Sequence, residues 1–304
     1  MGMSYRNFIL SGIVKQLSEN YDITLLVLKD SKLEVLIDQT YYKYISLKLG
    51  IFEKIIKKST SFIEKLQYLN FYEKHNSATM EKYIQKEKEN KLFFIQSVVS
   101  KIIGGFFDKY SYFSWHYSFI LSKKLRKRLL NFDNVFLLST DYILDKAILK
   151  YCSSNNINVN VIVHSWDNLP ARGFLSSKPN KILVWNKIMK IQAKVLHNMY
   201  DNNIEIVGIP QFQYYKSKEN LISKEKFRVL YNINDSKNIV TYTCSAHRVF
   251  PDEPMFVKKL IEIINKIGCK LILRLHPTER FEYYINTYLN ESSVISQVAP
   301  LLLQ

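Results

Sequence analysis

A polar ten-residue stretch, HSWDNLPARG (164–173), comes directly after the apolar run VNVIV (159–163). Its hydroxyl, carboxylate and amide groups are suited to hydrogen bonds with sugar or glycerol hydroxyls. Its indole can stack on a ring, and its guanidinium can clamp a phosphate. The stretch therefore contains a set of candidate binding residues, namely His164, Ser165, Trp166, Asp167, Asn168 and Arg172.

The same residue types also have ordinary structural roles. Asp167 and Asn168 are typical N-cap residues, because a short polar side chain can accept from the first free N–H groups of a helix. Trp166 can pack beneath the loop, and Arg172 can be a solvated surface residue. From the sequence alone, this stretch can be either a ligand-binding loop or the capped start of a helix.

A second polar stretch, TCSAHRVFPDE (243–253), links an apolar run to a predicted helix. Ser245, His247 and Arg248 lie in this link, where the N–H groups of a helix start favour an anion. The imidazole of His247 can act as an acid or a base near neutral pH. Asp252 and Glu253 favour the positive end of the helix dipole, which explains them without catalysis.

A third candidate site lies in LILRLHPTE (271–279). Strand alternation places Ile272, Arg274 and His276 on one side of the strand, and Pro277 ends it. Arg274 and His276 are thus close neighbours at a strand end, where a phosphate could bind. The alternative is a buried arginine paired with an acidic residue.

The elements that must position these residues are strands alternating with helices. In the first half of the pattern, the sequence predicts strands over 134–139, 157–165, 180–186 and 203–212, with helices over 141–154 and 187–200. A further unit has strands over 238–244 and 270–276 around a helix over 253–268. This alternation predicts an α/β fold with parallel sheets, whose ligands bind at the carboxyl ends of the strands.

The helix predicted over 253–268 has an apolar stripe that we expect to be buried, formed by Phe256, Leu260, Ile263, Ile264 and Ile267. At the start of the chain, residues 6–20 predict one helix and residues 22–29 a buried strand. Residues 40–130 predict several helices rich in Tyr, Phe, Ile and Lys, ending in the basic cluster SKKLRKRLL (122–130). Basic residues beside aromatic ones can rest on an anionic membrane surface, or they can be solvated helix faces.

The composition indicates a globular protein of two domains, with 304 residues, 47% hydrophobic residues, 8 Gly and 7 Pro. The net charge of +16 attracts anions such as nucleic acid, anionic lipid or phosphorylated substrates, although a lysine-rich surface composition also explains it. The three cysteines predict no disulfide framework and no metal site, which fits a reducing cytoplasm. We find no Walker loop, no complete GxGxxG motif, no convincing signal peptide and no membrane-spanning run.

Taken in order, several segments resemble two-domain glycosyltransferases of the GT-B architecture. The closest likeness is to bacterial surface-polysaccharide enzymes near the CDP-glycerol glycerophosphotransferases and the non-hydrolysing UDP-N-acetylglucosamine 2-epimerases. The segments that carry it are YRNFILSGIVKQLSENYDITLLV, SWDNLPARG, VWNKIMKIQA, VGIPQF, FRVLYNINDSKNIVTYTCS followed by PDE, and LRLHP. The likeness covers most of the chain and is looser over 40–130.

The resemblance implies a role for each matching residue. Ser165, Asp167 and Asn168 would face the acceptor, and His164 resembles the histidine that some glycerophosphotransferases use as a base. His276 would meet the donor phosphate, with Arg274 beside it. The SAHR segment (245–248) is weakly similar to a histidine–arginine pair of the epimerases, so an epimerase-like enzyme stays as a variant.

The implied reaction is group transfer from a nucleotide-activated donor to a hydroxyl of a lipid-linked or polymeric glycan, with no cofactor and no metal. The expected location is the cytoplasm, with peripheral contact to the inner face of the cell membrane. A basic nucleic-acid-binding protein and an inactive membrane-associated scaffold are the alternatives from other classes. No recognised nucleic-acid motif supports the first of these, so we expect no specific nucleic-acid partner.

The resemblance also predicts the domain boundaries. We expect an acceptor-side domain over 1–210, with the helical insertion at about 40–130, and a donor-side domain over 211–304. Relatives of this kind have a strand before YRNFILSG and further elements after LHP. We therefore expect the donor-side domain to be incomplete.

Overall fold

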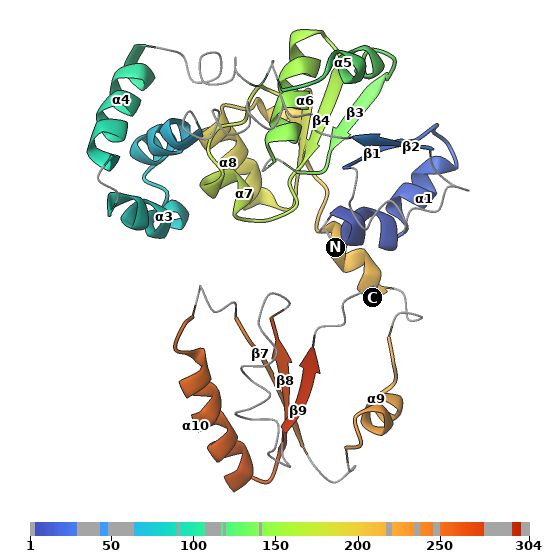
Figure 1. The fold of residues 1–304 in the computed structure, drawn as a ribbon. Coiled ribbons are helices and arrows are strands. Elements are labelled where there is room, and N and C mark those ends of the chain that lie inside the picture. Colours follow the sequence, from blue (N-terminus) through green and yellow to red (C-terminus); the bar gives the residue numbers. More distant parts are fainter. Residues whose placement is uncertain are drawn as a thin grey trace. The chain divides into compact units, whose positions relative to one another are not determined.

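The computed structural model describes residues 4–28, 43–47, 64–89, 92–106, 117, 120–139, 142–216, 221–233, 238–245, 250–276 and 294–298. The chain divides into two compact units, Gly2–Tyr214 and Tyr215–Gln304, which are described separately (Figure 1). The sequence predicts this boundary after residue 210. Every strand pairing in the described residues is parallel. The predicted α/β class with parallel sheets is confirmed.

The first unit is built on a four-stranded parallel sheet with the order β3-β4-β5-β6. Its apolar residues alternate along each strand, which buries one set of side chains beneath helices. Val135 and Leu137 in β3 and Val159 and Val161 in β4 belong to this buried set. The strand bounds are β3 (Asn134–Leu137), β4 (Asn158–Ile162), β5 (Lys181–Val184) and β6 (Ile204–Ile206).

Helices cover the face of the sheet to which these valines point. They contribute Leu129, Ala147 and Ala193 to the same hydrophobic core, and all three are fully buried. The helices over 143–154 and 187–197 are amphipathic. Asn186 caps the second of these by accepting a hydrogen bond from Met189 N at 3.0 Å. The elements are α5 (Lys123–Leu129), α6 (Ile143–Ser154), α7 (Asn168–Ala171) and α8 (Lys187–His197), followed by the short 3₁₀ helices η3 (Asp201–Asn203) and η4 (Pro210–Lys216).

The N-terminal helix predicted over 6–20 is interrupted in the structure. A π-helix, η1 (Tyr5–Leu10), is followed by α1 (Ile13–Ser18), and Gly12 between them has φ +79°. An L side chain rarely adopts this conformation, so the glycine allows the chain to change direction there. The apolar spacing predicted the helical segments but not the break.

Strands β1 (Thr24–Leu28) and β2 (Lys43–Leu47) form a separate parallel pair. Leu26 packs against the same core as β3 and β4, whereas Val27 packs in a cluster with Leu138 and Ile162 on the other side. The pair therefore lies in the layer of the main sheet. No hydrogen bond joins β1 to β3 within the described residues, so the layer is interrupted between them.

The helical insertion predicted over 40–130 is present only in part, because residues 43–47 form strand β2 instead of a helix. It contains a helix over 64–75, α3 (Ala78–Lys88) and α4 (Phe93–Phe106). Phe71 and Phe174 stack edge to face at 4.9 Å between ring centroids, which joins the insertion to the main fold. No helix in the described part of the chain is both long enough and apolar enough to cross a membrane.

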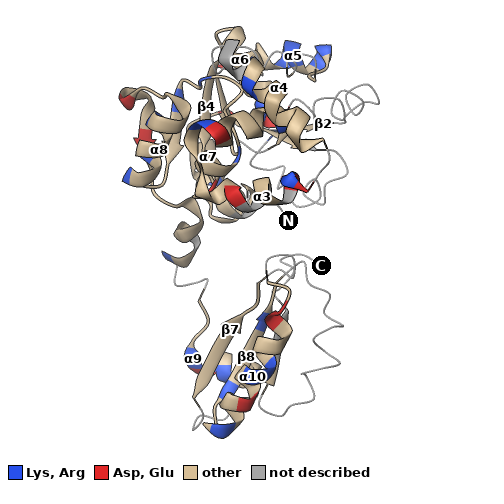
Figure 2. Cartoon of the chain, turned by 90° about the vertical axis from the view of Figure 1, so that its left-hand side faces the viewer, with Lys and Arg blue, Asp and Glu red and all other residues tan. Residues whose placement is uncertain are grey.

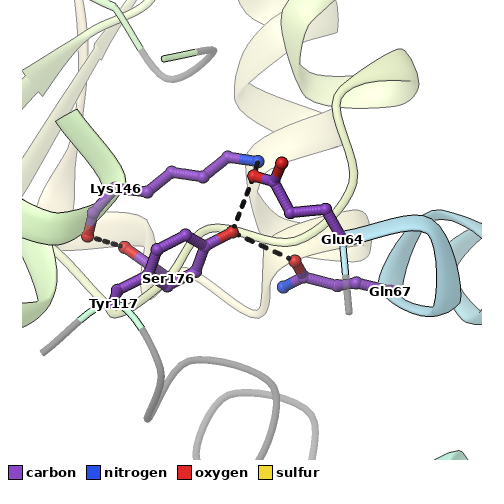
Figure 3. Close-up of polar contacts among 5 residues, drawn as sticks. All are labelled: Glu64, Gln67, Tyr117, Lys146 and Ser176. Atoms are coloured by element: carbon purple, nitrogen blue, oxygen red, sulfur yellow. Dashed lines mark hydrogen bonds and ion pairs between the residues drawn. The ribbon is translucent and has the colours of Figure 1, made fainter. Parts of the chain in front are cut away.

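An ion pair with a buried lysine also joins the insertion to α6, which packs on the four-stranded sheet (Figure 3). Lys146 Nζ, with its side chain 4% exposed, lies 3.1 Å from Glu64 Oε1. Tyr117 donates to the same oxygen at 3.1 Å, and Ser176 donates to the Lys146 carbonyl at 2.6 Å. Burial, followed by the charge of Glu64, raises the pKa of Tyr117, so its hydroxyl keeps the proton that it donates.

The second unit has a three-stranded parallel sheet in the order β7-β8-β9. Leu271, Leu273 and Leu275 point from β8 into the core, as the alternation predicts. The elements are α9 (Lys224–Leu230), β7 (Ile239–Thr243), α10 (Glu253–Lys266), β8 (Lys270–Leu275) and β9 (Val294–Val298).

The predicted buried stripe of α10 is largely wrong. The residues that α10 buries are Glu253, Pro254, Val257, Ile261 and Ile264. Phe256, Ile263 and Ile267 are instead exposed by 47%, 54% and 59%. The buried face of α10 therefore includes Glu253, whose carboxylate accepts hydrogen bonds inside the second unit.

Candidate functional site

His164 lies at the carboxyl end of β4, immediately after Val163, whose N–H donates to Leu183 of β5 at 3.0 Å. The side chain is 5% exposed. Its Nδ1 is buried and has no hydrogen-bond partner in the described part of the chain. A buried imidazole nitrogen without a partner is costly unless a ligand or a water completes it. Nδ1 of His197, in the core, also lacks a partner among the described residues, so it is the position of His164 at the carboxyl end of a strand that makes it a candidate to meet a ligand.

The loop after His164 is held by its own side chains. Ser165 Oγ donates to Asp167 Oδ1, and Ser165 N donates to Asn168 Oδ1 at 2.8 Å. Asn168 is 2% exposed, so its amide oxygen serves the loop. Asp167 occupies the N-cap position of α7, but its side chain makes no capping hydrogen bond. The carboxylate of Asp167 instead orients the Ser165 hydroxyl.

The remaining candidates of this loop reach the surface. Trp166 is 60% exposed, which contradicts the alternative that it packs beneath the loop. Arg172 is also exposed. Their exposure makes them available to a ligand at this edge of the sheet.

Trp185 is a residue that the sequence reasoning missed. It follows β5 as His164 follows β4, and its indole Nε1 is buried without a hydrogen-bond partner among the described residues. The signal was present in the sequence, because the VWN segment (184–186) ends a predicted strand. Two unsatisfied polar groups thus lie at the carboxyl ends of neighbouring strands.

Two side chains from distant parts of the chain position the loop through α7. The ring of His197 shares a 2.8 Å hydrogen bond through Nε2 with the Leu169 carbonyl, and Ser77 Oγ donates to the Pro170 carbonyl at 2.5 Å. His197 is 1% exposed, and burial lowers its pKa to about 4. The ring is neutral at physiological pH, so Nε2 carries the proton and donates it. The spacing Met189–Ala193–His197 places His197 on the buried face of α8, which was the available signal.

In the second unit, the structure brings Ser245, Arg274 and His276 to one edge of the sheet. Cys244 N donates to the Arg274 carbonyl at 2.8 Å, so the loop after β7 begins beside the end of β8. Arg274 is exposed, which contradicts the alternative of a buried, paired arginine. His276 is half-buried. His247 and Arg248 lie outside the described residues.

Glu253 has a defined structural role at the start of α10. It is 1% exposed, and its Oε1 accepts from Ser245 N at 2.8 Å and from Tyr242 OH at 2.9 Å. Burial, followed by the hydrogen bond to Glu253, raises the pKa of Tyr242 to about 12. The carboxylate holds the loop after β7 in place. It also puts a negative charge at the start of α10, where the sequence predicts that an anion could bind. Arg274 and His276 are therefore better placed than the α10 start to meet a phosphate.

The described residues contain no cluster of three or more His, Cys, Asp or Glu side chains that could hold a metal ion. Cys152 is buried, and this burial raises the pKa of its thiol to about 12, so the thiol is a poor nucleophile. A polar hollow of about 270 Å³ lies at the opposite, amino-terminal edge of the main sheet. Its lining residues are Ser153, Asn156, Ile157, Lys178, Pro179, Asn180 and Asn203. We place the candidate site at the carboxyl edge, where parallel sheets bind ligands.

Comparison with known proteins adds no assignment to this geometry. No protein-family model matches the chain, and no curated protein matches it either.

Proposed function

We propose that the protein transfers a glycosyl or phosphopolyol group from a nucleotide-activated donor to a hydroxyl, in the synthesis of a cell-surface polysaccharide. The two-domain GT-B architecture is part of this proposal. The observation that carries it is His164, a 95% buried histidine at the carboxyl end of β4 with an unpartnered Nδ1. The resemblance of the SWDNLPARG and LRLHP segments to such transferases supports the same conclusion.

The roles in the first unit follow from the loop geometry. The acceptor hydroxyl would hydrogen-bond to the His164 imidazole, which removes its proton as the oxygen attacks. Ser165 and Asp167 would bind neighbouring hydroxyls, with Asn168 holding the backbone of the loop in place. Trp166 and Arg172 would contact the more distant part of the acceptor, because both are exposed.

The roles in the second unit concern the donor. Arg274 and His276 would bind the phosphate oxygens and stabilise the charge that develops on the leaving group. Ser245, and also His247 and Arg248, would complete the set from the loop after β7. A new bond forms from the acceptor oxygen to the sugar carbon or to phosphorus. The bond to the leaving nucleoside diphosphate or monophosphate breaks at the same centre.

Release of the nucleotide tests the proposal. The full chain would be incubated with UDP- and CDP-activated donors and a membrane-derived acceptor fraction, and free nucleotide would be quantified by chromatography. We expect His164→Ala to slow release by about 100-fold or more, which is typical for loss of a general base. Asn203→Ala, at the opposite edge of the sheet, is the matched control and should keep the wild-type rate. Equal rates for His164→Ala and the wild type would refute the assigned role.

A further inference from the structure

His164 and Trp185 occupy matching positions at the ends of two neighbouring strands. The pairing of β4 with β5 joins Ile162 to Leu183, and Val163 N donates to the Leu183 carbonyl at 3.0 Å. This register, continued by two residues, places His164 beside Trp185 on strands that are about 4.8 Å apart. The helices that follow the two residues, α7 and α8, also lie side by side (Figure 1, Figure 2).

Each of the two side chains has a buried polar atom that no described residue satisfies. These atoms are His164 Nδ1 and Trp185 Nε1. Gln192 Oε1 and His197 Nδ1 are in the same condition within the described part of the chain, but both belong to α8 and not to a strand end. An indole Nε1–H can only donate a hydrogen bond, so it needs an acceptor. A buried donor without an acceptor costs free energy.

The backbone around Trp185 is fixed on both sides. Val207 N donates to the carbonyl of Val184, directly before Trp185, at 2.9 Å. Asn186, directly after Trp185, caps α8. The position of the indole is thus set by the sheet and by the helix start, as a preorganised binding group requires.

We propose that Trp185 binds the acceptor, and that its Nε1–H donates to the same hydroxyl oxygen that gives its proton to His164 Nδ1. This role rests on the proposed transfer reaction. A hydroxyl oxygen has four directions, of which its carbon takes one and its proton, pointing to His164, another. One lone pair accepts from Trp185, and the second lone pair attacks the donor. The new bond joins this oxygen to the sugar carbon or to phosphorus, the proton moves to Nδ1, and the nucleotide leaves with the pair of electrons of the broken bond.

This arrangement selects the chemical class of the acceptor. A neutral amine nitrogen has a single lone pair, so an amine that accepts from Trp185 has none left for attack. An ether oxygen has no proton to give to His164. The paired site therefore takes an alcohol hydroxyl, such as that of a sugar or a polyol.

The indole N–H signals of the full chain, labelled with ¹⁵N-tryptophan, test this binding by NMR without a donor or turnover. The chain has 3 Trp, and Trp115→Phe and Trp166→Phe assign the Trp185 signal by elimination. The probes are glycerol and glucose, as a polyol and a sugar. We expect at least one of them to shift the Trp185 signal saturably. His164→Ala should weaken the apparent affinity about threefold or more, because it removes one of the two hydrogen bonds to the oxygen, whereas Asn203→Ala should titrate like the wild type.

The nucleotide-release assay tests the role of Trp185 in the reaction. Trp185→Phe should raise the acceptor concentration that gives half the maximal rate about threefold to tenfold, because one neutral hydrogen bond is lost. The maximal rate should stay within about twofold, since this hydrogen bond is made before and during attack. Tyr200→Phe removes a polar group from an aromatic ring that is 67% exposed at the amino-terminal edge, and this matched control should behave like the wild type.

Three outcomes would overturn the inference. These are a Trp185 signal that neither probe shifts, equal titration of His164→Ala and the wild type, or release kinetics that Trp185→Phe leaves unchanged. A saturable shift of the Trp185 signal without any nucleotide release would refute the transfer reaction and support the shared hydroxyl site, so failure of the inference and failure of the proposed function give different results.

Discussion

His197 is the residue that most directly links stability to the candidate site, because it supports α7 through the Leu169 carbonyl. Its pKa is about 4 in the folded chain, against about 6.5 when unfolded. The unfolded state therefore binds a proton between these values, whereas the folded state does not. The contribution of His197 to the free energy of unfolding is fully present above pH 6.5. It is lost as the pH falls toward 4, by up to about 3 kcal/mol.

We therefore predict that the free energy of unfolding falls between pH 7 and pH 5 and that His197→Gln removes part of this fall. The variant should also lose about 1–2 kcal/mol at pH 7, because its amide replaces a well-placed ring donor in a closely packed cluster. Urea denaturation at the two pH values measures both effects. A wild-type pH slope that His197→Gln leaves unchanged would exclude this residue as its source.

At the scale of elements, the break between β1 and β3 has a measurable consequence. Ile23 O accepts from Lys43 N, so alternate residues of β1 turn their backbone groups toward β2. The backbone N–H and C=O groups of Leu26 and Leu28 point away from β2. Val163 N donates to Leu183, so Val159 and Val161 turn their backbone groups toward β5 and Asn160 turns its groups toward β3. With the register of β3 and β4, this turns the backbone groups of Phe136 away from β4. These amides face the interruption in the layer.

We predict that the amides of Leu26, Leu28 and Phe136 exchange with solvent deuterium faster than those of Leu25 and Leu137, which point into ladders. Residue-resolved hydrogen exchange by NMR measures this alternation, with the paired amides as internal controls. Uniformly slow exchange along both strands would mean that β1 and β3 belong to one continuous sheet.

The alternation of apolar and polar residues was sufficient to predict most strands and helices of both units, because burial imposes that period directly. It also located His164, Arg274 and His276, since each marks the point where an apolar run ends. The α10 stripe was wrong because α10 buries the face that carries Glu253, Val257 and Ile261, and apolar spacing does not indicate that a carboxylate is buried. The break at Gly12 depends on one backbone angle.

The supports of the candidate site could not be predicted from local sequence. Ser77 reaches Pro170 across 93 residues, and His197 reaches Leu169 across 28. Glu64 and Lys146 pair across 82 residues. Such contacts form only when the insertion packs against the four-stranded sheet and its helices. No residue spacing in a single sequence therefore identifies them.

At the scale of the whole molecule, each unit has its own hydrophobic core and its own polar strand ends. The core of the first unit includes Val161 and Ile182, and the core of the second includes Val257 and Leu271. The excess of 43 basic over 27 acidic residues gives the whole chain a field that favours anionic ligands. A nucleotide-activated donor fits this field.

The central claim is that the chain binds a nucleotide-activated donor, and calorimetric titration of the full chain with UDP- and CDP-activated donors tests it most directly. We predict saturable binding of at least one donor, weakened about tenfold or more by Arg274→Ala, because a phosphate contact from Arg is charge-assisted. Lys270→Ala, at the other end of β8, should bind like the wild type. Absence of binding by every donor, or equal affinity of Arg274→Ala and wild type, would contradict the account.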